Sequence, residues 1–281
     1  MRPSERLTLS FLVGLSALAL PGLPGSATSL AVFVALAAAT LLLARNGAAA
    51  PRLVRDFFPV ALVIAVYLAL EPVIVGGNSG RWDAIFAALD ERWAGALVAA
   101  WHGAFGRRAL AVDAVYVAYL SYYLVPIVAV VLARREGPEA FERGVFTLLL
   151  CYYASFIGYL LFPTSGPRLP PQDEARLLGG GAISDLVRSF LQVAEKTRLD
   201  AFPSGHTAIS LVAWAVGVRA LRRAALPLGA WVAAVVFSTV YVHVHYVVDV
   251  VAGAILAGIV LVAADALLRA LSPRERPEEA L

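Results

Sequence analysis

The sequence predicts an all-α, polytopic membrane helical bundle: a six-span core, two further N-terminal spans and an interfacial amphipathic helix. The first reason is composition, since 60% of the 281 residues are hydrophobic and only 15% are charged. The mean hydropathy of +0.77 exceeds what a soluble helical domain accommodates, because its helices need a polar outer face. The second reason is that the apolar residues fall into blocks close to the length that crosses a hydrocarbon core, about 20 residues.

Eight apolar segments are candidate membrane spans. The first is short and runs into a stretch rich in proline and glycine, so a retained span and a cleaved signal peptide both remain open there. We expect residues 1–56 to hold two spans and a cytoplasmic loop, residues 57–268 the six-span core, and residues 269–281 a disordered cytoplasmic tail. The spans are expected at about 8–24, 28–44, 57–76, 109–133, 143–162, 205–218, 225–243 and 246–268.

Arginine placement orients these spans. When the spans alternate in direction, both tails and the short connections on one side carry most of the arginines, among them Arg134, Arg222 and Arg223. Basic residues in short connections mark the cytoplasmic side of a membrane. We therefore expect an integral protein of a bacterial inner (plasma) membrane with both termini in the cytoplasm. The long segments 77–108 and 163–204 then lie on the extracytoplasmic face.

The segment 81–105 is predicted to form an amphipathic helix. Apolar side chains recur at helical spacing from Trp82 to Phe105, while polar residues such as Asp83 and Asp90 take the other side. Three of the five tryptophans of the chain fall in this segment, which is typical of a helix in the plane of the lipid headgroups. A packed extracytoplasmic lid is the alternative. Both interpretations place an amphipathic cover near the lipid surface.

Ionisable groups inside apolar spans, or at their edges, are costly, so each is a candidate for function. His245 and Asp249 are four residues apart and share one face of any helix that begins there. The carboxylate can accept the Nδ1–H of the imidazole, which leaves a lone pair on Nε2 and stabilises a cation on the ring. Taken alone, this pattern fits a nucleophilic histidine and a structural His–Asp pair about equally well.

The stretch "PSGH" precedes the sixth predicted span. Pro203 suits the first turn of a helix, Ser204 suits its cap, and Gly205 allows a close backbone approach. The free N–H groups of a helix N-terminus bind anions. His206 in the first turn is placed to protonate a departing oxygen. Because the predicted topology puts His206 and His245 on the same extracytoplasmic face, a paired-histidine site is favoured.

The stretch "FPTSGPR" follows the fifth predicted span and ends at Arg168. Its proline and glycine residues predict a turn that holds the loop against the membrane surface. A guanidinium group suits bidentate binding of phosphate. A lone arginine is not distinctive, because exposed charges mostly face solvent. Its position on the same predicted face as both histidines makes it a candidate for the same site.

In this order, "FPTSGPR", "PSGH" and "HYVVD" resemble the three signature stretches of the type 2 phosphatidic acid phosphatase superfamily, across roughly residues 57–268. That group comprises membrane lipid phosphatases and phosphotransferases, with vanadium haloperoxidases as soluble relatives. The resemblance implies that His245 attacks phosphorus to form a phosphohistidine, that Asp249 orients it, and that His206 protonates the leaving oxygen. The residues expected to hold the phosphoryl oxygens are Arg168, Ser204 and Gly205.

Two positions depart from the pattern of the common phosphatases. Leu161 stands where a lysine is expected seven residues before the first-motif arginine, and Thr239 stands where an arginine is expected six before the nucleophilic histidine. Arg198 or Arg176, in the same long loop, is a candidate to supply the missing charge. The remaining stretches look more like the inositol-phosphorylceramide synthase branch and its bacterial relatives, whose members transfer a headgroup phosphate between lipids.

We therefore expect a metal-independent phosphoryl-transfer enzyme without a cofactor. Its partner would be a membrane lipid, either a phospholipid, an isoprenoid pyrophosphate or a sphingolipid, together with water or an alcohol as acceptor. A strict phosphatase acting on phosphatidic acid or isoprenoid pyrophosphate is the alternative within this class. The net charge of +3 and the absence of a clustered basic stripe give no case for nucleic acid.

Two readings from other classes remain. A proton- or ion-coupled transporter would use Glu71, Asp113 and the histidines as a path, although the spans lack the paired glycine and proline breaks of a midplane site. A metal site at His243 and His245 is disfavoured, because residues two apart diverge on a helix. In the expected bundle, Asp113 and Glu71 make structural hydrogen bonds.

Overall fold

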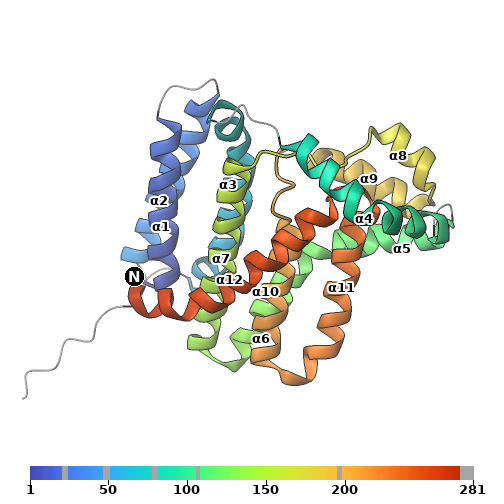
Figure 1. The fold of residues 1–281 in the computed structure, drawn as a ribbon. Helices are drawn as coiled ribbons and strands as arrows, with labels where there is room; N and C mark the ends of the chain where they lie inside the picture. Colours follow the sequence, from blue (N-terminus) through green and yellow to red (C-terminus); the bar gives the residue numbers. More distant parts are fainter. Residues whose placement is uncertain (21–24, 47–50, 78–81, 106–107, 195–197, 273–281) are drawn as a thin grey trace, which may run out of the picture.

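The computed structural model describes residues 1–20, 25–46, 51–77, 82–105, 108–194 and 198–272, and within them the chain is helical without strands (Figure 1). This confirms the predicted all-α bundle. The helices are α1 Pro3–Ala19, α2 Ser26–Arg45, α3 Arg52–Gly77, α4 Asp83–Phe105, α5 Ala109–Leu120, η1 Ser121–Leu124, α6 Val125–Glu136, α7 Pro138–Leu161, α8 Pro171–Leu178, α9 Ala182–Ala194, α10 Gly205–Ala220, η2 Arg222–Ala224, α11 Ala225–Tyr241 and α12 Val247–Leu271.

Six segments of the described chain are long and apolar enough to cross a membrane. They are α2, α3, α5 continued through η1 into α6, α7, η2 with α11, and α12, which coincide with six of the predicted spans. α1 and α10 cover the other two predicted spans, but they have only 17 and 16 residues. α10 packs against α6, α7, α11 and α12. Neighbouring helices therefore cover much of this short helix.

The core around α10 positions the upper end of the bundle. Ala208, Ile209, Val212 and Ala213 of α10 are all buried and pack with residues of α6, α7, α11 and α12. Small side chains let the helices approach closely, which is the usual basis of helix association in membranes. The start of α10, the end of α7 and the start of α12 are thereby brought to the same end of the bundle (Figure 1).

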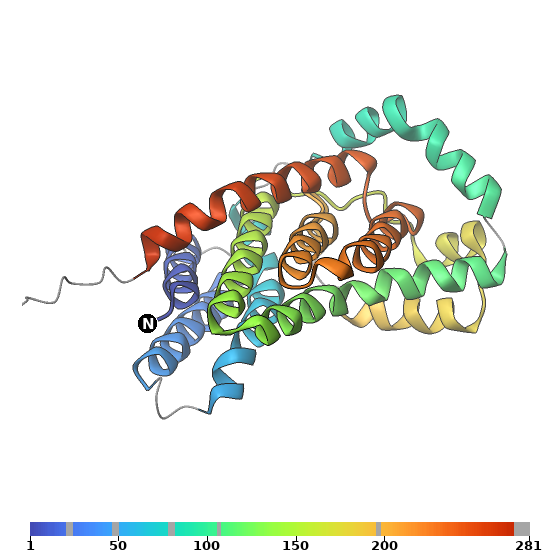
Figure 2. The ribbon, with the colours of Figure 1, turned by 90° about the horizontal axis from the view of Figure 1, so that it is seen from below.

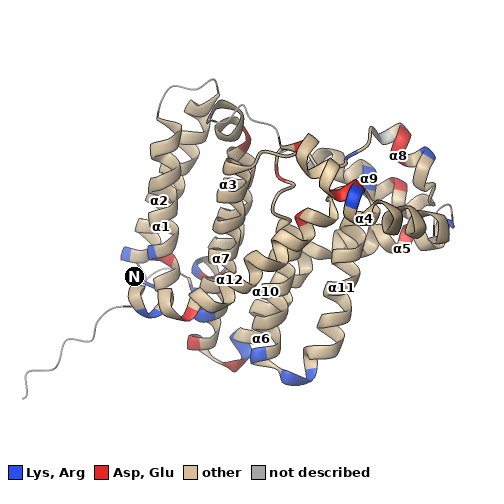
Figure 3. Cartoon of the chain, viewed as in Figure 1, with Lys and Arg blue, Asp and Glu red and all other residues tan. Residues whose placement is uncertain are grey.

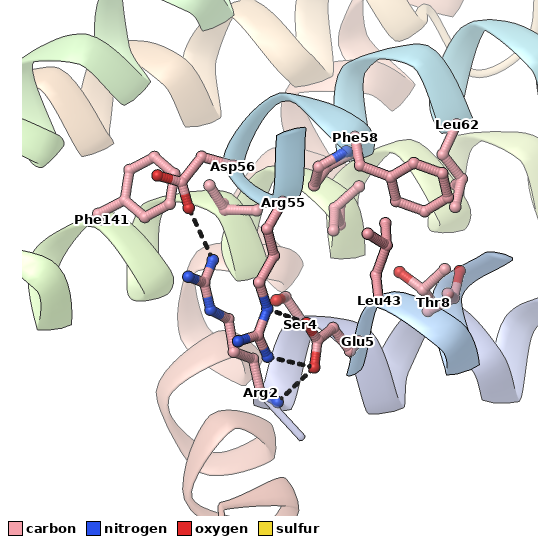
Figure 4. A pocket seen from close by; sticks show the side chains of 14 residues that line it. Arg2, Ser4, Glu5, Thr8, Leu43, Arg55, Asp56, Phe58, Leu62 and Phe141 are labelled. Carbon is pink, nitrogen blue, oxygen red and sulfur yellow. Dashed lines mark hydrogen bonds and ion pairs between the residues drawn. The ribbon is translucent and has the colours of Figure 1, made fainter. Parts of the chain in front are cut away.

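The N-terminal hairpin of α1 and α2 packs on α3 and α7 through an apolar core that includes Leu12, Leu15 and Phe33. Ion pairs fasten its lower end. Arg55 Nε of α3 lies 2.7 Å from Glu5 Oε1 of α1, and Arg2 Nη1 lies 2.9 Å from Asp56 Oδ1 (Figure 4). Arg134 at the end of α6 also pairs with Asp56. The hairpin is therefore joined by charges to the helices that carry the rest of the fold.

Arginines gather at the end of the bundle where the N-terminus lies. Figure 3 shows them at the turn between α6 and α7 and at the turn between α10 and α11. They include Arg134, Arg135, Arg222 and Arg223. The starts of α10 and α12 lie at the opposite end (Figure 1).

α4 lies across the bundle rather than along it (Figures 1 and 2). This confirms the predicted helix, but its apolar side chains do not all face the same way. Phe86 and Ala94 are buried against the protein, whereas Trp93 is 83% exposed and Ile85 and Leu89 are exposed as well. Two carboxylates of α4 also face inward: Asp83 bonds the loop that follows α7, and Asp90 bonds the start of α12. The helix therefore contacts the protein and still presents apolar side chains outward.

Candidate active site

Two histidines from distant parts of the chain meet at the upper end of the bundle. His206 lies in the first turn of α10, and His245 lies in the turn between α11 and α12. His206 Nδ1 and His245 Nε2 are 3.1 Å apart, a hydrogen-bond distance. The His245 side chain is buried, and the His206 side chain is half-buried. The two rings therefore face each other through one nitrogen each, although the residues are 39 positions apart in the sequence.

Asp249 lies behind His245. Its carboxylate is fully buried, and Oδ2 lies 3.5 Å from His245 Nδ1. That distance is long for a hydrogen bond but short for a charge contact. The same Oδ2 accepts the backbone N–H of Tyr246 at 2.8 Å, which caps α12. The cap holds the carboxylate in place beside the imidazole.

The prediction that His245 and Asp249 lie on the same face of one helix is wrong in one respect. α12 begins at Val247, so His245 lies in the preceding turn and only Asp249 lies on the helix. The carbonyl of Thr239, at the end of α11, accepts the N–H groups of Val244 and His245 at 3.0 and 3.1 Å. These two bonds fold the turn back over α11. They bring the His245 imidazole to the Asp249 carboxylate through the fold of a turn, and helical spacing does not predict this.

Ser204 joins the starts of α10 and α12. Its Oγ accepts the backbone N–H of Thr207 at 3.2 Å, so it is the predicted cap of α10. Its own N–H donates to the carbonyl of Asp249 at 3.0 Å. A Cβ atom at Gly205 would run into the hydroxyl of Tyr159, so the close approach predicted there requires a glycine.

Arg168 lies at the end of the loop that follows α7. Its Nη2 donates to Asp200 Oδ1 at 3.0 Å, and the Tyr67 hydroxyl donates to Asp200 Oδ2 at 2.7 Å. Asp200 therefore holds the Arg168 guanidinium and is itself held by Tyr67 of α3. Within the same loop, Gly166 has φ +74° and lies against the carbonyl of Val244. The Arg168 loop is thus packed directly on the turn that carries His245.

A cavity of about 80 Å³, lined by both charged and apolar side chains, adjoins this loop and turn. Arg168 forms one wall, and Arg198, which is itself exposed, also lines it. Arg176 does not reach the cavity; it is exposed and pairs with Asp173. Arg198 is therefore the better placed of the two candidates for the charge that is missing at Leu161 and Thr239.

Sequence reasoning missed another arginine of this cavity. Arg188 of α9 is buried, and it donates to the hydroxyl of Tyr116 at 3.0 Å and to Asp185 at 3.0 Å. The same hydroxyl bonds Glu174, the carboxyl of which has its pKa raised by burial. Spacing along the chain carries no signal for the contacts of Arg188 with Tyr116 and Glu174, because these residues come from three different helices, α9, α5 and α8.

Asp113 has a structural role, as expected. Its Oδ1 accepts the backbone N–H groups of Gly181 and Ser184 at 3.0 and 2.9 Å, which caps the start of α9.

His243 and His245 point to different partners. The His243 ring stacks on His102 of α4 with a centroid distance of 4.6 Å and an interplanar angle of 7°. His245 instead faces His206. Within the described residues, no group of three or more histidine, cysteine, aspartate or glutamate side chains is arranged to hold a metal ion.

Stability below neutral pH should depend on His243. Burial, followed by the neighbouring His102, lowers its pKa to about 4. The unfolded chain takes up this proton near pH 6.5, so folding becomes less favourable as pH falls from there toward 4, by about 1.4 kcal/mol per pH unit. His243→Asn removes the titration and still tolerates the left-handed φ of +55°.

We expect the Tm of the wild-type protein in detergent to fall more steeply across that pH range than the Tm of His243→Asn. Parallel curves for the two proteins would contradict this.

A family model described as the PAP2 superfamily matches residues 85–263. No curated protein and no solved structure matches the chain. The matched range begins in α4 and ends in α12, so it contains Arg168, Ser204, Gly205, both paired histidines and Asp249.

Proposed function

The chain belongs to the PAP2 superfamily, and on this premise we propose that it is an integral membrane enzyme that transfers the phosphoryl group of a lipid phosphate through a phosphohistidine on His245. The family indicates phosphatase-type phosphoryl transfer on lipid phosphates. One observation carries the finer proposal: His206 Nδ1 lies 3.1 Å from His245 Nε2, with Asp249 on the far side of the same imidazole. The proposed nucleophile therefore has the proposed acid on one side of its ring and the proposed orienting carboxylate on the other.

In the first step, the Nε2 lone pair of His245 attacks phosphorus and the bond from phosphorus to the lipid oxygen breaks. His206 gives its proton to that oxygen, which leaves as a neutral hydroxyl. The imidazole becomes cationic as the N–P bond forms, and the carboxylate of Asp249 stabilises the cation. In the second step, His206 accepts the proton of the incoming hydroxyl, which attacks phosphorus and releases His245.

Substrate entry requires the histidine pair to separate. The two nitrogens are in hydrogen-bond contact, which leaves no room for a phosphorus atom with its leaving oxygen in line between them. His206 is the half-buried partner, whereas His245 is buried and held by the Thr239 carbonyl. The His206 ring is therefore the one that moves.

The phosphoryl oxygens need donors as negative charge develops on them. The start of α10 supplies backbone N–H groups, with Ser204 as cap and Gly205 leaving the approach open. Arg168 supplies a guanidinium that Asp200 holds in orientation. Arg198, on the rim of the adjacent cavity, is a further source of positive charge.

The acceptor is a hydroxyl group of a second molecule, as in the inositol-phosphorylceramide synthase branch and its bacterial relatives. The cavity beside Arg168 supports this, because Glu174, Gln192 and Arg198 line it and can bond several hydroxyl or phosphate oxygens. Strict hydrolysis of phosphatidic acid or isoprenoid pyrophosphate is the second candidate, and the phosphatase-type chemistry of the family favours it. The arginine-rich opposite end supports an extracytoplasmic site.

The test is to incubate the purified protein with phosphatidic acid, an isoprenoid pyrophosphate and phosphatidylinositol, each with and without an alcohol acceptor. Mass spectrometry then shows whether phosphate leaves as inorganic phosphate or reappears on the acceptor. We expect turnover that persists in chelator and stops with vanadate, an analogue of the five-coordinate phosphorus. Movement of a lipid across sealed vesicles without phosphate release would instead identify a transporter.

A further inference from the structure

We propose that α4 is a positioning element of the active site, with Asp83, Asp90 and His102 as the residues through which it acts. The inference rests on the function proposed above. It concerns the geometry of that site rather than its chemistry. The three side chains lie along one helix, and each contacts a different segment that carries a candidate catalytic or phosphate-binding residue.

Asp83, the first residue of α4, holds the loop that ends at Arg168. Its Oδ1 accepts the backbone N–H of Ser165 at 2.8 Å. Just before the helix, the Trp82 N–H donates to the carbonyl of Pro163 at 3.4 Å, and the Trp82 ring packs edge-on against Phe162. α4 therefore begins anchored to the phosphate-binding loop.

Asp90, two turns further along, holds the start of α12. Its Oδ1 accepts the backbone N–H of Val248 at 3.2 Å. Val248 directly precedes Asp249, the carboxylate behind the His245 imidazole. A carboxylate at a helix N-terminus also interacts favourably with the helix dipole. Asp90 thus fixes the backbone from which Asp249 projects.

His102, near the end of α4, holds the turn that carries His245. Its ring stacks on His243, and its Nε2 lies 3.0 Å from the carbonyl of Tyr241. The contacted residues flank the turn two and four positions before His245. A further contact reaches the segment before Ser204: the rings of Phe86 and Phe202 stack with a centroid distance of 4.3 Å.

These contacts involve all three signature stretches or their direct neighbours. A rigid helix bonded to each segment sets their mutual distance. Displacing α4 would therefore alter the site without removing any residue that touches substrate.

The experiment compares alanine and conservative variants at each contact, with kcat and KM measured on the same lipid substrate. Asp90→Ala should lower kcat by about tenfold while KM stays within about twofold, because it disturbs the nucleophile and its carboxylate. Asp83→Ala should mainly raise KM, because it loosens the loop of Arg168. His102→Ala should lower kcat, and His102→Phe, which keeps a ring for stacking, should restore most of it.

Asp90→Asn keeps a carbonyl oxygen that accepts the Val248 N–H, so it should have nearly the wild-type kcat. Glu91→Ala is the matched control, since Glu91 is exposed on the same helix. Each rate is expressed per folded protein, judged by Tm, so that a loss of stability alone does not imitate the effect. If Asp90→Ala does not fold, the opposite kcat and KM effects at His102 and Asp83 decide the question.

The inference is overturned if the alanine variants keep wild-type kcat and KM, or if Asp90→Asn is as impaired as Asp90→Ala. Those results leave the proposed function standing, provided that the wild-type protein turns over lipid phosphate. Absence of turnover in the wild-type protein, by contrast, contradicts the proposed function itself.

Discussion

His245→Ala should abolish turnover, with a loss of about a thousandfold or more, because no other side chain can take the place of the nucleophile. The imidazole is buried between Asp249 and His206, so an alanine there leaves a cavity and removes the partner of the buried carboxylate. Each rate is therefore expressed per folded protein, judged by Tm. Release of inorganic phosphate and formation of phosphorylated acceptor are both measured. Full activity in this variant would contradict the phosphohistidine mechanism.

His206→Ala offers a more selective version of the same experiment. Without its proton donor the first step slows, but a substrate with a good leaving group needs no protonation. The second step still lacks its base, so phosphate should accumulate on His245. We expect an acid-labile, alkali-stable phosphoenzyme in His206→Ala with an activated phosphate ester. No phosphoenzyme should form in the His206→Ala/His245→Ala double variant.

Gly166→Ala should cause the second large loss, although residue 166 supplies no catalytic group. Its φ of +74° costs an alanine about 1 kcal/mol, and a Cβ atom there would also clash with the carbonyl oxygen of Val244. Backbone cannot yield as a flexible side chain does. Either the Arg168 loop or the turn of His245 must move, so we expect kcat/KM to fall by at least about tenfold.

Gly258→Ala is the matched control for this prediction. A Cβ atom at Gly258, within α12, meets nothing within 4 Å. Alanine is also the better helix former, so this variant should keep its Tm and its activity. Equal behaviour of Gly166→Ala and Gly258→Ala would show that the contact between the loop and the turn does not constrain the site.

Most of the helices could be predicted from the sequence because each apolar block has the length of a span. α1 and α10 were predicted as spans, but these helices have only 17 and 16 residues, and α10 packs against four other helices. Hydropathy reports the composition of a segment and does not report its neighbours. It therefore cannot distinguish a short helix inside the bundle from one that meets lipid on all sides.

The candidate site was predictable where local patterns carry the signal. Ser204 and Gly205 form the expected cap, and His206, His245 and Asp249 come together. Their catalytic roles remain predictions until activity is measured. The reason for the contact differs from the expected one, since His245 approaches Asp249 through a turn and not along a helix.

Contacts between segments that are distant in the sequence could not be predicted, because they leave no local pattern in it. Arg188 meets Tyr116 and Glu174 only after α5, α8 and α9 have packed. The same holds for α4, where the helical spacing of the apolar residues predicted the helix correctly. It gave no indication that Asp90 bonds Val248, 158 residues later.

The hydrogen bond from the Ser204 N–H to the Asp249 carbonyl joins the start of α10 to the start of α12. His206 lies in the first turn of α10, and Asp249 lies behind the His245 imidazole. The two histidines can therefore reach their observed contact only when both helices are in place. A substitution that displaces either helix start would separate the pair, even if it lies far from both imidazoles.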